Sequence, residues 1–419
     1  MKFQHGLCIA IFVSCANPLY LPSLYLGQLQ SIVQDSSQGG EKTLVEESIA
    51  RTERQLPQLP DRGAGLYVLS TLNQQLGHTE KALQLLKECV SLREGFDPAG
   101  SPNLGALHGR KEFDELVAKV HKEFPVVNHT RIALIAPEVG LMPEGLAYDV
   151  RQDAFYLSSL NRRKIVRITR AGRASDFAPQ GRYGLLPVLG IRPDPDTGTV
   201  WAASWSEDTN QSELLHFDGS GTLLGRFVPT ETREHGFNDL VIGGRGDILL
   251  TDSLTNEIYR FDPISHAFQA LTVCRPPSTP NGIAITPDRK KLYVADDFGV
   301  VLVDLQTGLS SDVHAGPHST LAGIDGLYWW KGNLVAVQNA IGSPRIAMFR
   351  LSKDGKQVVQ TTVLENRPSF RFVPTTGAIR GRNFYFIIDS QADKMDGDKV
   401  MKTTKLEATR IGILRLPRM

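Results

Sequence analysis

Oxygen-bearing side chains recur at one kind of place in this chain, at the short turn that opens an apolar run. The turns are PEGLAYD with Glu144, FND with Asn238 and Asp239, PNGIAI with Asn281, and IDGLY with Asp325. Carboxylate and amide oxygens are the ligands that hard cations such as Ca²⁺ prefer. If folding brings these turns to one point, their carboxylates would repel each other without a cation. The residue types therefore predict a divalent-cation site, with ligands Glu144, Asn238, Asn281 and Asp325.

Each of these residues taken alone also has an ordinary explanation. Asn, Asp and Gly favour tight turns, and Pro presets one of the turn dihedrals. A single Pro-Asn-Gly or Pro-Glu-Gly sequence therefore indicates only a turn. The prediction of a cation site depends on the set as a whole and on a fold that brings its members together.

A repeat in the sequence supplies such a fold. Six stretches share a turn, a short apolar run, a polar turn and a second apolar run, as in TPNGIAITPDRKKLYVADD at 279–297. This pattern is typical of two strands joined by a hairpin. The turn glycines or their equivalents are Gly145, Gly190, Asp239, Gly282, Gly326 and Gly377, at spacings of 45, 49, 43, 44 and 51 residues. A strand-and-turn repeat of this length predicts a mainly β fold, a six-bladed β-propeller.

The ends of the repeat region predict how the ring closes. The last repeat offers only three strands, in TTGAIRG, NFYFIIDS and RIGILRLP. A strand near 131–136, before the first repeat, is expected to complete this blade and so remove an exposed sheet edge. The first strand of each blade lies innermost in such propellers, so the residues just before it are expected to face the central channel.

Four segments are expected along the chain, namely a signal peptide at 1–16, a linker at 17–40, a helical region at 41–124 and the propeller at 129–419. Residues 1–16 have a basic start, an apolar run and a small-residue end, which indicates export to the periplasm or the outside. The alternative is lipid anchoring at Cys15, because FVSC resembles a bacterial lipobox. No later run reaches the roughly 20 apolar residues needed to span a bilayer.

The helical region predicts a helix at 41–55, a helix pair interrupted at 76–78, and a helix at 111–124. Its small residues Gly77, Ala82 and Cys89 match a tetratricopeptide-like repeat, although only about one and a half repeat pairs are present. Two alternatives stay open, a cap packed on the propeller and a surface that binds a protein partner. Cys89 is expected in a helical core, and whether it pairs with Cys274 stays open.

The composition excludes some partners. The formal net charge of +1 over 419 residues gives no electrostatic support for binding a nucleic acid.

The acidic stretch 391–405 lacks the ligand spacing of an EF-hand calcium loop. We expect it to be a solvated, charged insert in the last blade.

The motifs PEGLAYD, FNDLVIGGRGDILLTDS, PNGIAITPDRKKLYVADD and GIDG resemble the senescence-marker-protein/gluconolactonase superfamily and its paraoxonase-like relatives. The resemblance covers about 130–419 and implies a six-bladed propeller that holds a divalent ion and hydrolyses lactones or related esters. Matched residue by residue, it implies that the four oxygen residues listed above are metal ligands or lie next to one. Ca²⁺ is the first expectation, with Mg²⁺, Mn²⁺ and Zn²⁺ as alternatives. EGLAY departs from the EGP-aromatic form of gluconolactonases, which leaves sugar-lactone specificity open.

Three residues are candidates for the acid–base chemistry of such a hydrolase. Asp325 is the first candidate for the base that takes a proton from water, and Asp239 is the second. His235, three residues before Asn238, is the third, as a base or a substrate contact. The expected partner is a small lactone or ester. The alternative is a non-catalytic propeller scaffold that binds a protein or a glycan.

Overall fold

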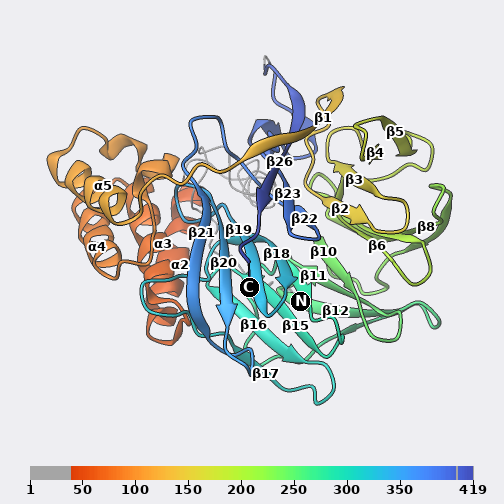
Figure 1. Cartoon of the computed structure of the whole chain (residues 1–419). Helices are drawn as coiled ribbons and strands as arrows, with labels where there is room; N and C mark the ends of the chain where they lie inside the picture. The colour runs from red at the N-terminus through yellow and green to blue at the C-terminus, as the bar shows by residue number, and fades with distance from the viewer. Residues whose placement is uncertain (1–38, 403, 419) are drawn as a thin grey trace.

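Six four-stranded antiparallel sheets are arranged around a central channel in the computed structural model, which describes residues 39–402 and 404–418 (Figure 1). The predicted mainly β, six-bladed propeller is therefore confirmed. The predicted signal peptide and nearly all of the predicted linker lie outside the described residues.

The strands of the first three blades follow the repeat in order. Blade one contains β2 (Leu146–Asp149), β3 (Ala154–Ser159), β4 (Lys164–Thr169) and β5 (Ala174–Ala178). Blade two contains β6 (Val188–Pro193), β7 (Val200–Ser206), β8 (Gln211–Phe217) and β9 (Leu223–Phe227). Blade three contains β10 (Phe237–Ile242), β11 (Ile248–Asp252), β12 (Glu257–Asp262) and β13 (Ala267–Ala270).

The next two blades have the same order. Blade four contains β14 (Ile283–Ile285), β15 (Lys291–Asp296), β16 (Gly299–Asp304) and β17 (Ser310–Asp312). Blade five contains β18 (Ile324–Trp330), β19 (Asn333–Gln338), β20 (Arg345–Leu351) and β21 (Val358–Asn366). Apolar side chains from facing blades fill the spaces between them, as in the cluster around Phe217, Tyr156 and Phe177.

The sixth blade combines the two ends of the propeller. Its strands are β22 (Gly377–Arg380), β23 (Asn383–Ile387), β26 (Ala408–Arg415) and β1 (Arg131–Val139). β1 pairs antiparallel with β26, with Arg131 opposite Ile413 and Ile135 opposite Arg410. The predicted closure by a strand near 131–136 is confirmed. Backbone hydrogen bonding across this pair fixes the ring without a covalent link.

The first strand of each blade is the innermost, as expected. β2, β6, β10, β14, β18 and β22 each contact the next in this order, and β22 contacts β2. This ring brings the start of every inner strand to the same end of the channel, because all six run in the same direction along it. The turn residues singled out in the sequence therefore share one end.

Within residues 39–128, four α-helices precede the propeller and pack against one side of it. They are α2 (Gly39–Gln55), α3 (Arg62–Gln75), α4 (Thr79–Ser91) and α5 (Lys111–Glu123). α3 ends at the predicted break, where Gly77 adopts a φ of 75°. Cys89 is buried in the helical core as expected, and neither Cys89 nor Cys274 is in a disulfide. No helix in the described ranges is long and apolar enough to cross a membrane.

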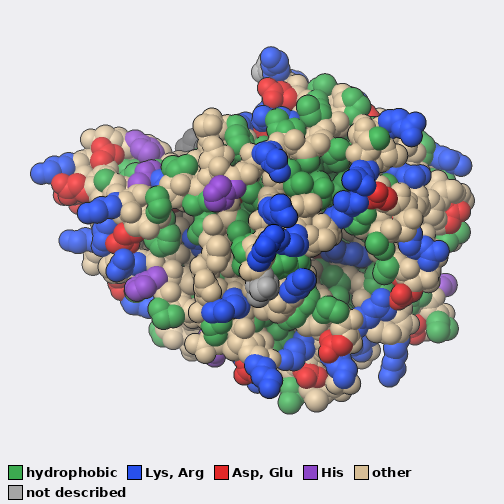
Figure 2. All heavy atoms as spheres, viewed as in Figure 1, with side chains coloured by type: hydrophobic (Ala, Val, Ile, Leu, Met, Phe, Trp, Pro, Cys, Tyr) green, Lys and Arg blue, Asp and Glu red, His purple; other side chains and the backbone are tan. Residues whose placement is uncertain are grey.

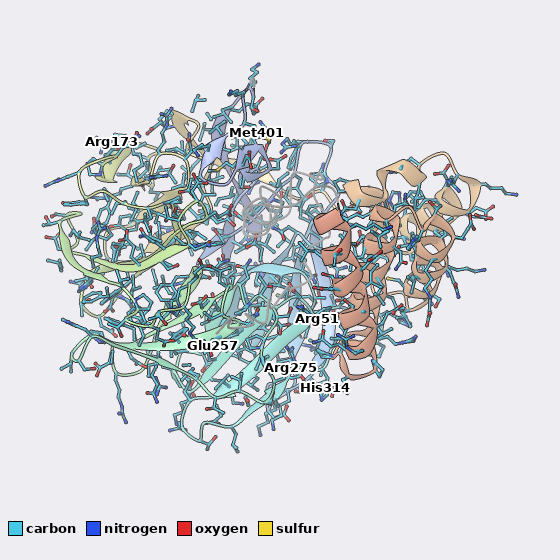
Figure 3. The ribbon with its side chains drawn as sticks, turned by 180° about the vertical axis from the view of Figure 1, so that it is seen from behind. Arg51, Arg173, Glu257, Arg275, His314 and Met401 are labelled. Carbon is cyan, nitrogen blue, oxygen red and sulfur yellow. The ribbon has the colours of Figure 1, made fainter. Side chains whose placement is uncertain are left out.

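The helices share a hydrophobic core with blades four and five. Phe298, Ala322 and Ile341 of the propeller belong to the same buried cluster as Leu66 and Leu86 of the helices. Seen from behind, the helices flank one side of the ring, and Met401 marks the insert near its upper edge (Figure 3). This packing agrees with a cap on the propeller. The tetratricopeptide likeness and a protein partner stay predictions.

The insert at 391–405 differs from the expected solvated loop, and that expectation is wrong. Asp393 and Asp398 are each only 8% exposed, and Met395 is 4% exposed. Asp398 accepts hydrogen bonds from Arg163 (3.0 Å), from Ser206 Oγ (2.7 Å) and from the backbone N–H of Glu207 (3.0 Å). The carboxylates of the insert thus bind cationic and polar groups of neighbouring segments, which holds the insert against blades one and two.

Candidate functional site

The inner turns pack so closely that most positions of the repeat require glycine. A Cβ on Gly145 would lie 2.1 Å from the carbonyl oxygen of Leu189, in the next blade. A Cβ on Gly282 would lie 2.3 Å from the carbonyl oxygen of Asp325. These two glycines therefore touch the residue that precedes the glycine of the next blade. This contact puts the residues before the glycines side by side around the channel end.

The structure refines where two of these residues lie. Asp325 and the Asn238-Asp239 pair are inside β18 and β10, rather than in a turn before the strand. Each lies at a shift in register with the second strand of its blade, between Ile324 and Gly326 and between Phe237 and Leu240. A bulge of this kind redirects a side chain out of the regular alternation of the strand.

Three oxygen atoms of the predicted ligand set are buried and receive no hydrogen bond from any described residue. They are Glu144 Oε2, Asn281 Oδ1 and Asp325 Oδ1. A buried acceptor without a donor carries the full desolvation cost, about 1–3 kcal/mol and more for a charged group. All three belong to types that bind hard cations. The residues therefore fit a divalent cation, which would satisfy all three oxygens.

The electrostatics link the same residues. Burial raises the pKa of the Glu144 carboxyl well above its usual range, and the negative charges of Asp325 and Glu207 raise it further. Burial raises the pKa of Asp325 to about 7, opposed by hydrogen bonds from Asn339 and Asn281. Because the charges of Glu144 and Asp325 act on each other, and the Asn281 side chain acts on the pKa of Asp325, three of the four predicted ligands lie together.

Asn238 lies at the same channel end. Asn238 and Glu144 line one small cavity of about 10 Å³, which is room for a single water molecule or ion. The Nδ2 of Asn238 donates to Ser253 Oγ at 3.2 Å, and Ser253 Oγ in turn donates to the carbonyl of Pro280 at 2.7 Å. This chain of bonds fixes the orientation of the amide.

Sequence reasoning missed the residues that hold the set in place. Ser158 Oγ accepts the backbone N–H of Gly145 at 2.6 Å, Ser253 holds Asn238, and Asn339 donates to Asp325. All three lie at the end of the second strand of a blade, in YLSS, LTDS and VAVQN. The sequence signal that could have identified them is a polar residue that recurs at the end of the second strand in several repeats.

Asp239 has a different environment from the predicted ligands. It occupies the place of the turn glycine, and its Oδ1 accepts the backbone N–H of Leu240 at 2.8 Å and lies 3.5 Å from Nη2 of Arg192. Burial raises the pKa of Asp239, and the Arg192 charge opposes that rise. Its carboxylate is thus directed toward a guanidinium and backbone amides.

His235 lies in a separate place. Its Nδ1 is 2.6 Å from Asp252 Oδ2, and its ring is 4% exposed. It lines a cavity of about 460 Å³ between blades two and three, together with Ser212 and Arg226. None of the four predicted ligands lines that cavity. The structure does not bring His235 together with the predicted cation ligands.

The channel end that carries the set is covered. Met395 of the insert packs with Met142, Leu189 and Trp205 in one buried cluster. Met142 lies two residues before Glu144, and Leu189 directly precedes Gly190. On the other side of the small cavity, Arg192 and Tyr328 separate it from the rest of the channel, because both line the two spaces.

In the part of the chain that the structure describes, no three His, Cys, Asp or Glu side chains form a group that could hold a metal ion. The candidate set combines two carboxylates with two amides, so it depends on the amide oxygens of Asn238 and Asn281. This composition favours Ca²⁺ or Mg²⁺ over transition metals.

Comparisons with known proteins agree with the fold. A gluconolactonase from Xanthomonas campestris matches with a TM-score of 0.50 and 17% identity, over 70% of this chain and 94% of that chain. An aldose sugar dehydrogenase from Streptomyces coelicolor matches at 0.48 and 15%, over 68% and 97%. A virginiamycin B lyase from Staphylococcus aureus matches at 0.47 and 14%, over 69% and 100%. No family model and no curated protein matches this sequence.

The gluconolactonase match shows a fold class. The chain forms a six-bladed β-propeller of the kind found in gluconolactonases, as the motifs had indicated. At such low identity the likeness extends to the fold alone, and propellers carry out many different functions.

Proposed function

We propose that this protein binds a divalent cation, Ca²⁺ before Mg²⁺, at the channel end and hydrolyses a lactone or related ester there. The observation that carries the proposal is the group of three buried oxygens without donors, Glu144 Oε2, Asn281 Oδ1 and Asp325 Oδ1. Together with Asn238 they would hold the cation. A bound cation would supply a positive charge that polarises a substrate carbonyl.

The charge balance supports this proposal. Glu144, Asp239 and Asp325 bring three negative charges when ionised, and Arg192 brings one positive charge, which leaves a deficit of two. Glu207 also acts on Glu144 as a negative charge, so the deficit is at least two. A divalent cation would remove it, whereas the cation-free site must keep protons on its acids.

The acid–base role is assigned to Asp325. The pKa of its carboxyl is about 7 without a cation, and a bound cation would lower it, so the carboxylate would be ionised and able to accept a proton at neutral pH. It would accept a proton from the attacking water as the hydroxyl adds to the carbonyl carbon. The ring C–O bond then breaks, and the proton passes to the alkoxide oxygen that leaves. Asp239 is a weaker candidate because its carboxylate faces Arg192.

A second candidate function is a structural cation in a non-catalytic propeller that binds a protein or glycan. The observation that favours it is the small, covered cavity of about 10 Å³. Substrate would reach the cation only if the insert or Arg192 moved. Both candidate functions include a bound cation, and only the hydrolase turns over a substrate.

The test measures cation content and turnover in one preparation. We expect one Ca²⁺ per chain, lost in Glu144→Gln and Asp325→Ala, and cation-dependent hydrolysis within a panel of sugar and aliphatic lactones. Asp389→Asn is the matched control, because Asp389 is a buried carboxylate already paired with Arg371 at 2.8 Å. Bound Ca²⁺ without hydrolysis of any lactone would support the structural role. A chain that binds no cation would rule out both.

The expected export and the lipid-anchor alternative belong to the same proposal. They rest on residues 1–16 alone. Cell fractionation of the full chain, with and without Cys15→Ala, separates a freely exported protein from an anchored one.

A further inference from the structure

The central channel contains a second space beyond the candidate cation site. This cavity has a volume of about 400 Å³ and is lined by residues of all six inner strands. Along each strand its lining residues come after the oxygen-bearing positions, as with Tyr148 after Glu144 and Leu327 after Asp325. The cavity therefore occupies the channel on the far side of Arg192. Its volume is within the range of small-molecule sites.

The wall of this channel cavity is mainly apolar. Ile285 and Ile379 are partly exposed and line the cavity, together with Ile242 and Ala378. They come from β10, β14 and β22. The face in Figure 2 is hollowed near the inner strands, with Lys or Arg side chains visible inside the hollow. The cavity thus has room for a short aliphatic chain beside these side chains.

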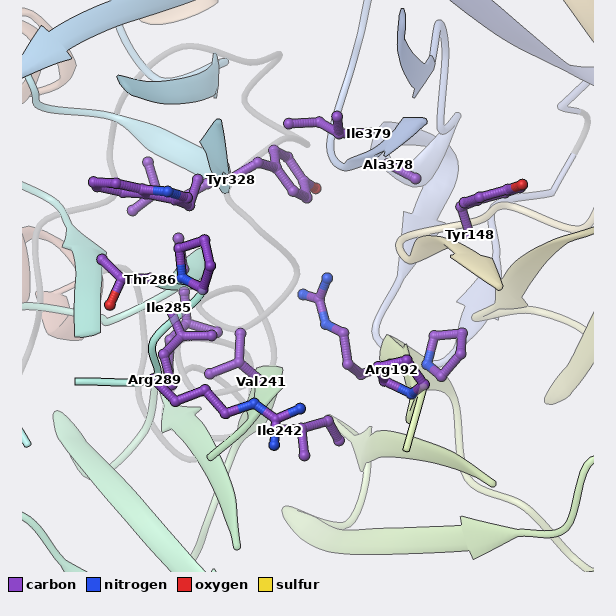
Figure 4. A pocket seen from close by; sticks show the side chains of 17 residues that line it. Tyr148, Arg192, Val241, Ile242, Ile285, Thr286, Arg289, Tyr328, Ala378 and Ile379 are labelled. Carbon is purple, nitrogen blue, oxygen red and sulfur yellow. The ribbon is translucent and has the colours of Figure 1, made fainter. Parts of the chain in front are cut away.

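Arg192 supplies a charged group at the inner end of this cavity. In Figure 4 its side chain extends from β6 into the open middle of the space. Its Nε donates to the carbonyl of Leu240 at 3.0 Å, and Nη2 makes a long contact of 3.5 Å with Asp239. A guanidinium has five N–H donors, so three have no acceptor among the described residues. These donors are directed at whatever occupies the channel.

Arg289 lines the same cavity and provides a contrast. Its Nη2 lies 2.6 Å from Asp196 Oδ2, and its Nη1 donates to the carbonyl of Gly243 at 3.3 Å. Its charge is therefore paired within the protein. Both arginines make two hydrogen bonds within the protein, but the ion pair of Arg192 with Asp239 is longer, at 3.5 Å against 2.6 Å for Arg289 with Asp196, and Arg192 is the one that extends into the middle of the cavity.

We propose that the channel cavity binds a small monocarboxylate with an aliphatic tail. Its carboxylate would accept hydrogen bonds from Arg192, and its tail would lie along β10, β14 and β18. Guanidinium and carboxylate form strong bonds with two parallel contacts, which a neutral head group cannot match. This binding goes beyond the proposed hydrolase and needs no cation.

The first experiment is a chain-length series by calorimetry on the full chain in EDTA. The probes are butanoate, hexanoate and octanoate. Each added methylene buried against the apolar wall is expected to tighten binding about fourfold. Methyl octanoate, which has the same tail without the charge, is expected to bind at least tenfold more weakly than octanoate. Equal affinities along the series, or for the ester, would overturn the proposal.

The second experiment uses matched variants. Arg192→Met is expected to lose at least tenfold in octanoate affinity, Arg192→Lys to lose less, and Arg289→Met to change it less than twofold. Ile379→Asp places a carboxylate on the cavity wall and is expected to reject octanoate while leaving Arg192 intact. Thermal melts report whether each variant folds. If folded Arg192→Met and Ile379→Asp both bind octanoate like the unmodified chain, the assignment is wrong, whether or not the cation site is confirmed.

Discussion

Asn339 donates a hydrogen bond from Nδ2 to Oδ2 of Asp325 at 2.5 Å, across the first two strands of blade five. The same amide lies 3.1 Å from the carbonyl of Pro374, which belongs to the connection into blade six. One oxygen of Asp325 is therefore held by the protein, and Oδ1 has no donor among the described residues. The hydrogen bond to Oδ2 fixes the orientation of the Asp325 carboxylate and leaves Oδ1 for a cation. Residues that hydrogen-bond to metal ligands commonly orient them in this way.

Replacement of Asn339 by Ala is expected to weaken cation binding. Loss of the hydrogen bond raises the pKa of Asp325 above about 7 and frees its orientation. We expect about a tenfold loss of Ca²⁺ affinity at pH 7, measured by calorimetry. Asn161→Ala is the control, since Asn161 donates only to the backbone carbonyl of Gly140 at 2.7 Å. Unchanged affinity in Asn339→Ala would mean that Asp325 is not a ligand.

Cation affinity is expected to rise with pH. Without a cation the pKa of Asp325 is about 7, so at lower pH a proton must leave before the cation binds. The dissociation constant for Ca²⁺ should increase at least tenfold for each pH unit below 7. The raised pKa of Glu144 acts in the same direction, because its proton must also leave before the cation binds. Titrations from pH 5.5 to 8.5 check this, and a flat profile would contradict a site made of these two acids.

Glu144→Gln is expected to have opposite effects with and without Ca²⁺. The buried carboxylate is disfavoured by desolvation and by Asp325, so removing its charge should stabilise the cation-free protein at pH 8, by about 1 kcal/mol. The same change should abolish the stabilisation that Ca²⁺ gives the unmodified chain. Urea unfolding in EDTA and in Ca²⁺ measures both. Destabilisation in EDTA would show that Glu144 has a favourable partner.

Gly145→Ala is expected to destabilise the propeller by about 2–4 kcal/mol, because the added Cβ would lie 2.1 Å from the Leu189 carbonyl oxygen. Neither backbone can move without shifting a whole blade. Gly105→Ala is the matched control, since no atom lies within 4 Å of the Cβ it would add. Urea unfolding compares them. Equal stabilities would mean that the blades can separate at this contact.

The interface between helices and propeller should weaken as pH rises. Burial, then the nearby charge of Asp61, raises the pKa of Glu94 to about 8 from its usual 4.5. An acid with a raised folded-state pKa contributes stability that is complete below pH 4.5 and is lost as pH rises through 8. Allowing for partial exposure of the side chain, we expect a loss of about 1–2 kcal/mol between pH 5 and 9.

Glu94→Gln tests this pH dependence, because it removes the ionisation while keeping the shape. Thermal melts of the unmodified chain should fall with pH, and those of the variant should change less. Glu88→Gln is the control, since Glu88 is an exposed partner of Arg62. Equal slopes in all three proteins would contradict the role of Glu94.

The repeat pattern predicted the elements because strand period and turn chemistry are local. Three strands of the last blade were predicted from TTGAIRG, NFYFIIDS and RIGILRLP, and the structure has β22, β23 and β26 there. The break at Gly77 and the closing strand were predicted for the same reason. The insert was predicted wrongly, because its charges alone could not reveal that Arg163 and Ser206 lie within reach of Asp398.

The sequence by itself determined six repeats, their glycines and the oxygen-bearing residues Glu144, Asn238, Asn281 and Asp325, since composition and spacing specify turns and strands. Only the tertiary structure decided that Glu144 and Asp325 interact, that His235 lies apart, and that Arg192 extends into the channel. Glu144 and Asp325 are 181 residues apart in the sequence. These relations arise when the ring closes, because packing between blades, rather than any local pattern, sets which side chains meet at its centre.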